Sequence, residues 1–154
     1  MRSDIQAFRD LVEDYQARFR GPNLEPFELS APYDLSPELG IPKIECPTSW
    51  PEGWPHSGRA GIYSLFGEEL QAVYIGKASL RNTLVSRLGS YFSYDKPHKT
   101  CRLNHAWKCR PRYLITIAVP EESRFEAPAL EEFLIIKLRP TDNTAGILRD
   151  KDFA

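Results

Sequence analysis

The stretch that most constrains the fold is residues 61–76, GIYSLFGEELQAVYIG. Two short runs of aromatic and β-branched residues, 61–66 and 72–77, flank a polar centre that contains a glycine. Such runs fit a pleated, half-buried surface, and this arrangement is typical of a β-hairpin. Alternate side chains of a strand share one face, so Tyr63 and Tyr74 can be brought side by side across the hairpin.

Four other segments have the periodicity of regular structure. Residues 3–20 carry apolar residues at helical spacing behind a serine that can cap the first turn, and a Gly-Pro pair ends the pattern. Residues 80–92 and 128–139 show the same spacing, and residues 113–119 form a β-branched run closed by a proline. We therefore expect an α/β (α+β) fold: a small three-stranded antiparallel sheet flanked by helices.

Proline dominates the chain between the first helix and the hairpin. Eight of the thirteen prolines lie within residues 22–55, and each removes a backbone donor and restricts the residue before it, so regular structure is not expected there. The segment is nevertheless too apolar for a free linker. We therefore divide the chain into residues 1–59, a helix and a proline-rich arm packed on the domain, and residues 60–154, the domain itself. The alternative, a surface for a protein partner or a homodimer within residues 1–59, stays open.

Charge is distributed unevenly along a chain whose net charge is −1. Residues 1–60 hold six Lys and Arg against ten Asp and Glu, residues 61–119 hold nine against three, and residues 120–154 hold five against eight. A concentrated basic segment is the electrostatic footprint of phosphate binding. Charge alone, however, favours a solvated cationic face.

Cysteine content and hydropathy indicate the compartment. The three cysteines are sparse and odd in number, which favours a reducing environment. No apolar run is long enough to cross a bilayer, and the acidic, amphipathic N-terminal stretch lacks the core of a signal peptide. We expect a cytoplasmic protein with no membrane segment.

The order of the motifs resembles the GIY-YIG nuclease family. The two tripeptides that name the family stand at residues 61–63 and 74–76, and Lys77 follows the second, as in a repair-enzyme branch of the family. Arg87 and Tyr91 lie four residues apart on the next predicted helix, where the family places such a pair.

The later part of the chain completes the family's order, with a glutamate on a helix followed by a proline and Asn143. Two adjacent glutamates compete for this metal-binding position. At about 100° per residue, Glu131 lies at the edge of the helix's apolar face, whereas Glu132 points nearly opposite it. A metal-binding carboxylate must emerge into a cleft, so Glu131 is the predicted ligand. The resemblance covers residues 60–146.

This resemblance implies a DNA endonuclease that uses a single Mg²⁺ or Mn²⁺ at Glu131 and leaves 5′-phosphate and 3′-hydroxyl ends. It also implies Tyr63 as the general base. Because a free phenol has a pKa of about 10, such a base needs positive charge beside it, which Lys77, Arg87 and the metal would supply. Arg87 can also contact phosphate oxygens bidentately.

The remaining motif residues have supporting roles in this interpretation. Tyr74 and Tyr91 would orient water or phosphate, and Asn143 would fix the geometry of the local backbone or of the Tyr and Glu side chains. Taken singly, Tyr63 and Tyr74 are ordinary strand residues, and a glutamate such as Glu131 is favoured at a helix N-terminus by the helix dipole. The order of all the motifs together favours the functional interpretation.

Residues 96–112 hold six basic residues and no acidic one. We predict that these contact DNA phosphates: Lys96, Lys99, Arg102, Lys108, Arg110 and Arg112. Trp107 would pack in the core or stack on a base. The same segment contains four zinc-binding residue types at a spacing unlike a standard finger: His98, Cys101, His105 and Cys109. In the alternative, the histidines face phosphate or solvent and the cysteines are buried thiols.

Two other classes of function compete with the nuclease. One is a non-catalytic nucleic-acid-binding module of the same fold, which would retain DNA without cutting it. The other is an interaction protein that acts through its acidic, proline-rich first sixty residues. Metal-dependent nicking of a plasmid separates the first from a nuclease, and deletion of residues 1–58 tests the second.

Overall fold

The computed structural model describes residues 3–143, and three long antiparallel strands form one side of its main sheet. β4 (Gly61–Gly67) lies between β5 (Ala72–Ala78), at the edge of the sheet, and β8 (Pro111–Ala118). The fold is α+β, as predicted, and these are the three predicted strands. Residues 144–154 of the predicted domain lie outside the described residues.

Three helices accompany the sheet: α1 (Asp4–Phe19), α2 (Leu84–Tyr91) and α3 (Glu126–Leu138). The predicted cap of α1 is confirmed, since the Ser3 hydroxyl accepts a hydrogen bond from the Gln6 amide at 3.2 Å. α2 begins later than predicted, because Thr83 caps it and Leu80 lies outside it. None of the helices in the described part of the chain is long and apolar enough to cross a bilayer.

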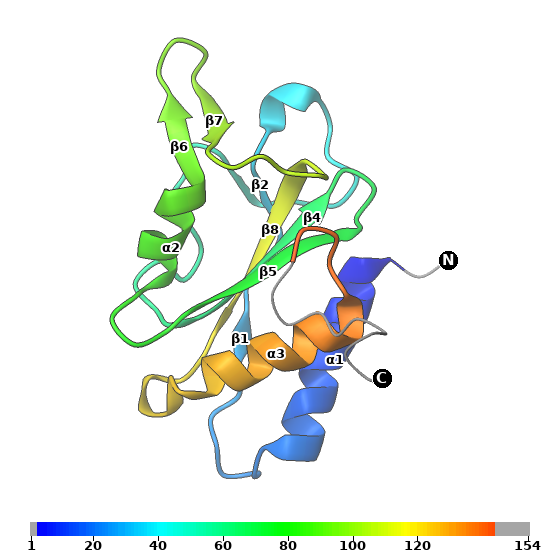
Figure 1. Cartoon of the computed structure of the whole chain (residues 1–154), viewed down its shortest axis with the longest axis vertical. Helices are drawn as coiled ribbons and strands as arrows, with labels where there is room; N and C mark the ends of the chain where they lie inside the picture. Colours follow the sequence, from blue (N-terminus) through cyan, green and yellow to red (C-terminus); the bar gives the residue numbers. More distant parts are fainter. Residues whose placement is uncertain (1–2, 144–154) are drawn as a thin grey trace, which may run out of the picture.

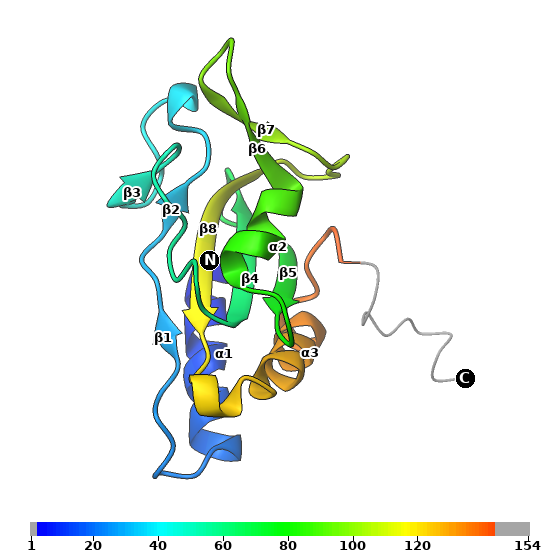
Figure 2. The same ribbon diagram turned by 90° about the vertical axis from the view of Figure 1, so that its left-hand side faces the viewer.

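The two faces of the sheet have different cores. Ile62 and Ile75 face α1 and α3 in one hydrophobic cluster, whereas Tyr63 and Leu65 face α2 in the other. This alternation is the one expected for strand β4. Figure 2 shows α1 and α2 on opposite sides of the sheet.

The basic segment forms a second, two-stranded sheet that the sequence pattern did not predict. β6 (Phe92–Asp95) starts directly after α2 and pairs with β7 (Thr100–Leu103). The hairpin projects beyond α2 at one end of the molecule (Figure 1). Lys99 in its turn has a positive φ of 57°.

The proline-rich arm adds strands to the main sheet, although the sequence predicted no regular structure there. β1 (Glu28–Leu29) and β2 (Tyr33–Asp34) pair antiparallel with β8, and β3 (Thr48–Ser49) pairs parallel with β2. Two short helical turns of the 3-10 type, η1 (Pro37–Leu39) and η2 (Glu121–Ser123), lie outside the strands. Each arm strand has two residues, a length that fits between neighbouring prolines.

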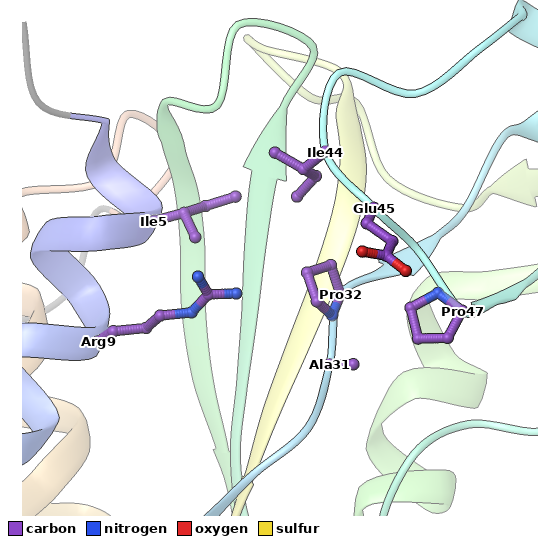
Figure 3. A pocket seen from close by; sticks show the side chains of 7 residues that line it. All are labelled: Ile5, Arg9, Ala31, Pro32, Ile44, Glu45 and Pro47. Atoms are coloured by element: carbon purple, nitrogen blue, oxygen red, sulfur yellow. The ribbon is translucent and has the colours of Figure 1, made fainter.

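A groove of about 450 Å³ separates α1 from the arm, on the α1 face of the sheet. Figure 3 shows Arg9 reaching into it from α1 and Glu45 bordering it from the arm. Ile5, Ile44 and Pro32 form apolar walls between them. None of the predicted site residues lines this groove.

Candidate active site

Three tyrosine hydroxyls meet on the α2 face of the sheet. The Tyr63 hydroxyl on β4 donates a hydrogen bond to the Tyr91 hydroxyl on α2 at 3.3 Å, and the Tyr74 hydroxyl on β5 also lies 3.3 Å from it. The Tyr63 and Tyr74 rings stack with centroids 6.1 Å apart. They are diagonal neighbours, because Tyr63 is paired with Gly76, and Leu65 with Tyr74.

Both motif glycines make room for this cluster. A Cβ on Gly76 would overlap the ring and hydroxyl of Tyr63, which lies across the strand pair. A Cβ on Gly61 would overlap the backbone carbonyl of Ile117 in β8. The glycines of the two tripeptides therefore allow β4 to lie close to β8 and the Tyr63 ring to lie over β5.

A polar cavity of about 290 Å³ opens beside the tyrosines. Its walls come from β4, β5, α2, α3 and the loop between β5 and α2: Tyr63, Tyr74, Lys77, Ser79, Leu80, Asn82, Arg87 and Glu131. Tyr91 lies behind this wall and accepts a long hydrogen bond of 3.5 Å from the Arg87 guanidinium. The structure thus brings together most of the residues to which the resemblance assigns catalytic roles.

The two glutamates of α3 have different surroundings. Glu131 is half-buried and lines the cavity, whereas Glu132 is exposed. Burial raises the pKa of Glu131, and the positive charges of Lys77 and Arg87 partly offset that effect. Within the described residues, Glu131 forms no salt bridge.

Burial also keeps the hydroxyls of Tyr63 and Tyr74 protonated. The pKa of Tyr63 is raised above its ordinary value, first by burial and then by the hydrogen bond with Tyr91. The pKa of Tyr74 is raised for the same two reasons. Arg87 opposes both shifts, and its own pKa is raised, first by its hydrogen bond with Tyr63.

Asn143 does not line the cavity but is buried against β5. Its Oδ1 accepts a hydrogen bond from the Ile75 amide at 2.9 Å, and its Nδ2 donates one to the Ile75 carbonyl at 2.9 Å. The Asp142 amide donates to the carbonyl of Val73 at 2.8 Å. Asn143 therefore satisfies the backbone of the edge strand between Tyr74 and Gly76. The side-chain hydrogen bonds of Asn143 are therefore to the local backbone, and not to a Tyr or Glu side chain.

Five of the six predicted DNA contacts are exposed: Lys96, Lys99, Arg102, Lys108 and Arg110. Arg110 donates to the Ser36 hydroxyl at 3.3 Å. The assignment of Arg112 to this surface is wrong, because its side chain is 3% exposed. Its guanidinium is bound by Asp34, at 3.1 Å, and by Glu68, at 2.9 Å.

The predicted zinc ligands do not assemble. Cys101 is buried in the core cluster on the α2 face, whereas the His98 side chain is 75% exposed and lies 3.1 Å from Asp95. The His105 ring lies tilted against Tyr91, with ring centroids 4.5 Å apart. Among residues 3–143, no three His, Cys, Asp or Glu side chains come together in a way that could hold a metal ion.

Sequence reasoning missed three residues of the cavity wall: Ser79, Leu80 and Asn82. It placed Leu80 on the same face of the predicted helix as Leu84 and Leu88, whereas Leu80 lies before the helix and is 86% exposed. Trp107 packs beside Tyr74 and Phe92, with ring centroids at 5.8 Å and 6.5 Å. This corresponds to the core alternative for that residue.

The fold and the cavity define a small α+β domain with a polar, tyrosine-rich site on one face of its sheet. The chain is similar to the UvrABC system protein C of Rickettsia bellii, with 37% identity over 95 residues. It is similar to proteins of the same name from Rickettsia canadensis, with 36% identity over 94 residues, and Rickettsia felis, with 37% over 95.

These matches cover 62%, 61% and 62% of this chain, respectively, and 13% of each relative's length. The chain therefore matches a minor part of those proteins. No family model matches the sequence, and no solved structure matches it.

Proposed function

We propose that this domain is a metal-dependent DNA endonuclease of the GIY-YIG type. The observation that carries the proposal is the convergence of Tyr63, Arg87 and Glu131 on one polar cavity from three separate elements. Tyr74 and Lys77 line the same cavity from β5. The similarity to UvrABC system protein C supports a domain of this kind.

Glu131 is the residue proposed to hold the metal. Its carboxylate is half-buried and forms no salt bridge in the described part of the chain, so Lys77 and Arg87 offset its burial only in part and a bound cation would add counter-charge. Oxygen donors suit Mg²⁺ and Mn²⁺, and the cavity of about 290 Å³ has room for an ion that keeps several waters. A bound ion would supply positive charge beside the phosphate and the leaving 3′ oxygen.

Tyr63 is proposed to take a proton from the attacking water. The water oxygen would then attack phosphorus and the bond to the 3′ oxygen would break. The departing 3′ oxygen would take a proton from solvent water, which leaves 5′-phosphate and 3′-hydroxyl ends. The raised pKa of Tyr63 means that its hydroxyl keeps its proton in the free protein. The hydrogen bond with Arg87 favours the phenolate, and the hydroxyl of Tyr91 can donate to it once the hydrogen bond between them reverses.

Arg87 is proposed to bind the scissile phosphate. Its guanidinium stays charged and presents paired N–H donors that match phosphate oxygens. Among the described residues it forms no salt bridge, and the Glu131 carboxylate in the same cavity acts on it without direct pairing. The exposed cations of the β6–β7 hairpin, which continues directly from α2, would position the rest of the DNA backbone.

The test is cleavage of supercoiled plasmid with Mg²⁺ or Mn²⁺, and with EDTA as a control. We expect Glu131→Ala to abolish nicking while circular dichroism and DNA retention stay unchanged. Glu132→Ala is the matched control, since it removes the same charge from the exposed position next in sequence. Normal nicking by Glu131→Ala would disprove the metal assignment. Salt-dependent retention of plasmid without any nicking by the wild type would favour the non-catalytic binding module.

A further inference from the structure

The loop between β5 and α2 presents an apolar side chain at the edge of the polar cavity. Leu80 lines that cavity, yet its side chain is 86% exposed. Its backbone has a φ of 57°, in the left-handed region that leucine rarely adopts. Strained residues of this kind persist where the surrounding structure holds them, and they cluster at functional sites.

An arginine between η2 and α3 holds this loop. Arg124 Nη2 donates hydrogen bonds to the Leu80 carbonyl at 2.7 Å and to the Asn82 carbonyl at 3.2 Å. Its Nη1 is paired with Glu121 at 3.2 Å. The loop itself is closed by a hydrogen bond from the Asn82 amide to the Ser79 carbonyl at 3.0 Å. These bonds fix the backbone while the Leu80 side chain projects into solvent.

A second large apolar side chain is next in sequence to Arg124. Phe125 follows Arg124 in the chain and is 75% exposed. The loop after β5 and the start of α3 lie on the same side of the molecule (Figure 1). Exposed apolar residues scattered singly are ordinary. Leu80 differs because it is held in a strained conformation at the edge of a charged site.

We propose that Leu80 packs against an unstacked base beside the scissile phosphate. This inference rests on the proposed function, since it assumes that Arg87 and Glu131 hold a DNA phosphate in the cavity. The backbone of DNA is polar and charged, and the large apolar surfaces that DNA offers are the faces of its bases. In a continuous duplex those faces are stacked, and leucine is one of the side chains that proteins insert between unstacked steps. The preferred substrate would therefore be DNA with an unpaired or kinked step, at a bubble, a flap or a nick.

The test uses a duplex with 2-aminopurine at an unpaired position in a small bubble, with EDTA present so that no cleavage occurs. The unpaired 2-aminopurine still stacks on its neighbours for part of the time, and contact with Leu80 should reduce that stacking. We therefore expect saturating wild-type protein to change the fluorescence of the 2-aminopurine. Leu80→Ala should leave that signal near the level of free DNA. Ile41→Ala is the matched control, because Ile41 is a similar aliphatic side chain that is 93% exposed on the arm.

Cleavage supplies the second measurement. With Mg²⁺, the wild type should cut the bubble substrate faster than the matched duplex. Leu80→Ala should reduce cleavage of the bubble roughly tenfold, and up to about fiftyfold if all three lost carbon atoms are fully buried in the contact. Leu80→Met should restore most of that rate, because it replaces the apolar volume. Equal fluorescence and equal bubble cleavage for Leu80→Ala and wild type would overturn the proposal.

The two proposals fail in different ways. A wild-type protein that cuts DNA, with Leu80→Ala behaving identically, leaves the nuclease assignment standing and removes the role of Leu80. A Leu80-dependent fluorescence change without cleavage by the wild type supports the base contact and contradicts the nuclease assignment. A wild-type protein that nicks plasmid but does not bind the bubble substrate overturns the role of Leu80 alone, and one that neither nicks plasmid nor binds the bubble overturns both proposals.

Discussion

Two arginines on the α2 side of the molecule have opposite electrostatic surroundings. Arg112 on β8 is buried and donates to both carboxylate oxygens of Asp34 at 3.1 Å and to Glu68 at 2.9 Å and 3.0 Å. It also donates to the Gly40 carbonyl at 2.6 Å. Arg87 on α2 donates a long hydrogen bond of 3.5 Å to the Tyr91 hydroxyl, interacts with the Tyr63 hydroxyl, and forms no salt bridge among the described residues.

The difference shows which positive charge is available to a substrate. A charge taken out of water needs counter-charges and hydrogen bonds, and Arg112 receives them from the arm and from the β4–β5 turn. Arg87 contacts tyrosine hydroxyls at a polar cavity that it shares with Glu131, and no carboxylate pairs with it directly among the described residues. Arg112 therefore holds the fold together, and Arg87 is the better candidate for catalysis.

Removal of Arg112 should have the largest effect on stability. Arg112→Ala leaves Asp34, which is 2% exposed, without its buried partner. We expect a loss of about 3–5 kcal/mol in the free energy of unfolding, the usual cost of breaking a buried ion pair on one side. Urea denaturation followed by tryptophan fluorescence measures it. A loss below about 1 kcal/mol, the scale of an exposed ion pair, would contradict this account of Arg112.

Removal of Arg87 should instead act on the reaction. Arg87→Ala is expected to lower kcat for plasmid nicking about 10²–10³-fold, the scale for one charge-stabilising donor in an active site. Its unfolding free energy should stay within about 0.5 kcal/mol of the wild type, as for surface substitutions. The comparison breaks if Arg87→Ala unfolds as readily as Arg112→Ala, because Arg87 would then also be structural.

The contrast between the arginines also shows how far sequence reasoning reaches. Periodicity over a few residues predicted the three long strands, and helical geometry placed Glu131 rather than Glu132 toward a cavity. Both inferences use neighbours in sequence. The burial of Arg112 depends on Asp34, which lies 78 positions away, so composition of the basic segment alone misassigned it.

Local backbone conformation set a second limit. Leu80, Leu84 and Leu88 fit one helical face by spacing, but the capping box of Thr83 and Ser86 starts the helix after Leu80. A non-glycine residue at positive φ gives no signal in a hydrophobic pattern. The strands of the arm were missed for a similar reason, since each is two residues long and its pairing with β8 is non-local.

The pH dependence of cleavage tests whether Arg87 favours the phenolate of Tyr63. Burial raises the pKa of Tyr63, so the phenolate that a general base requires becomes more populated as the pH rises. We expect kcat to rise about tenfold per pH unit between about pH 6 and pH 9, the range below the pKa of an ordinary phenol near 10. Arg87→Lys keeps the positive charge that favours the phenolate, so it should change the pH profile less than Arg87→Gln. Arg87→Gln removes that charge and should shift the profile to higher pH. A flat wild-type profile would argue against Tyr63 as the base.

The smallest effect is expected for DNA binding by exposed cations. Among these, too, some are paired with a carboxylate and others are not. Arg102 on β7 is exposed and its side chain has no partner among the described residues, whereas Lys43 on the arm is paired with Glu69 at 2.6 Å. If Arg102 contacts a phosphate, Arg102→Ala should weaken DNA binding a few-fold and lower the slope of log K against log salt by about 1. Lys43→Ala should leave both quantities unchanged, and fluorescence polarisation across a salt series measures them. An equal loss of DNA affinity for the two variants would mean that the cations of the β6–β7 hairpin attract DNA only through net charge, without a defined contact at Arg102.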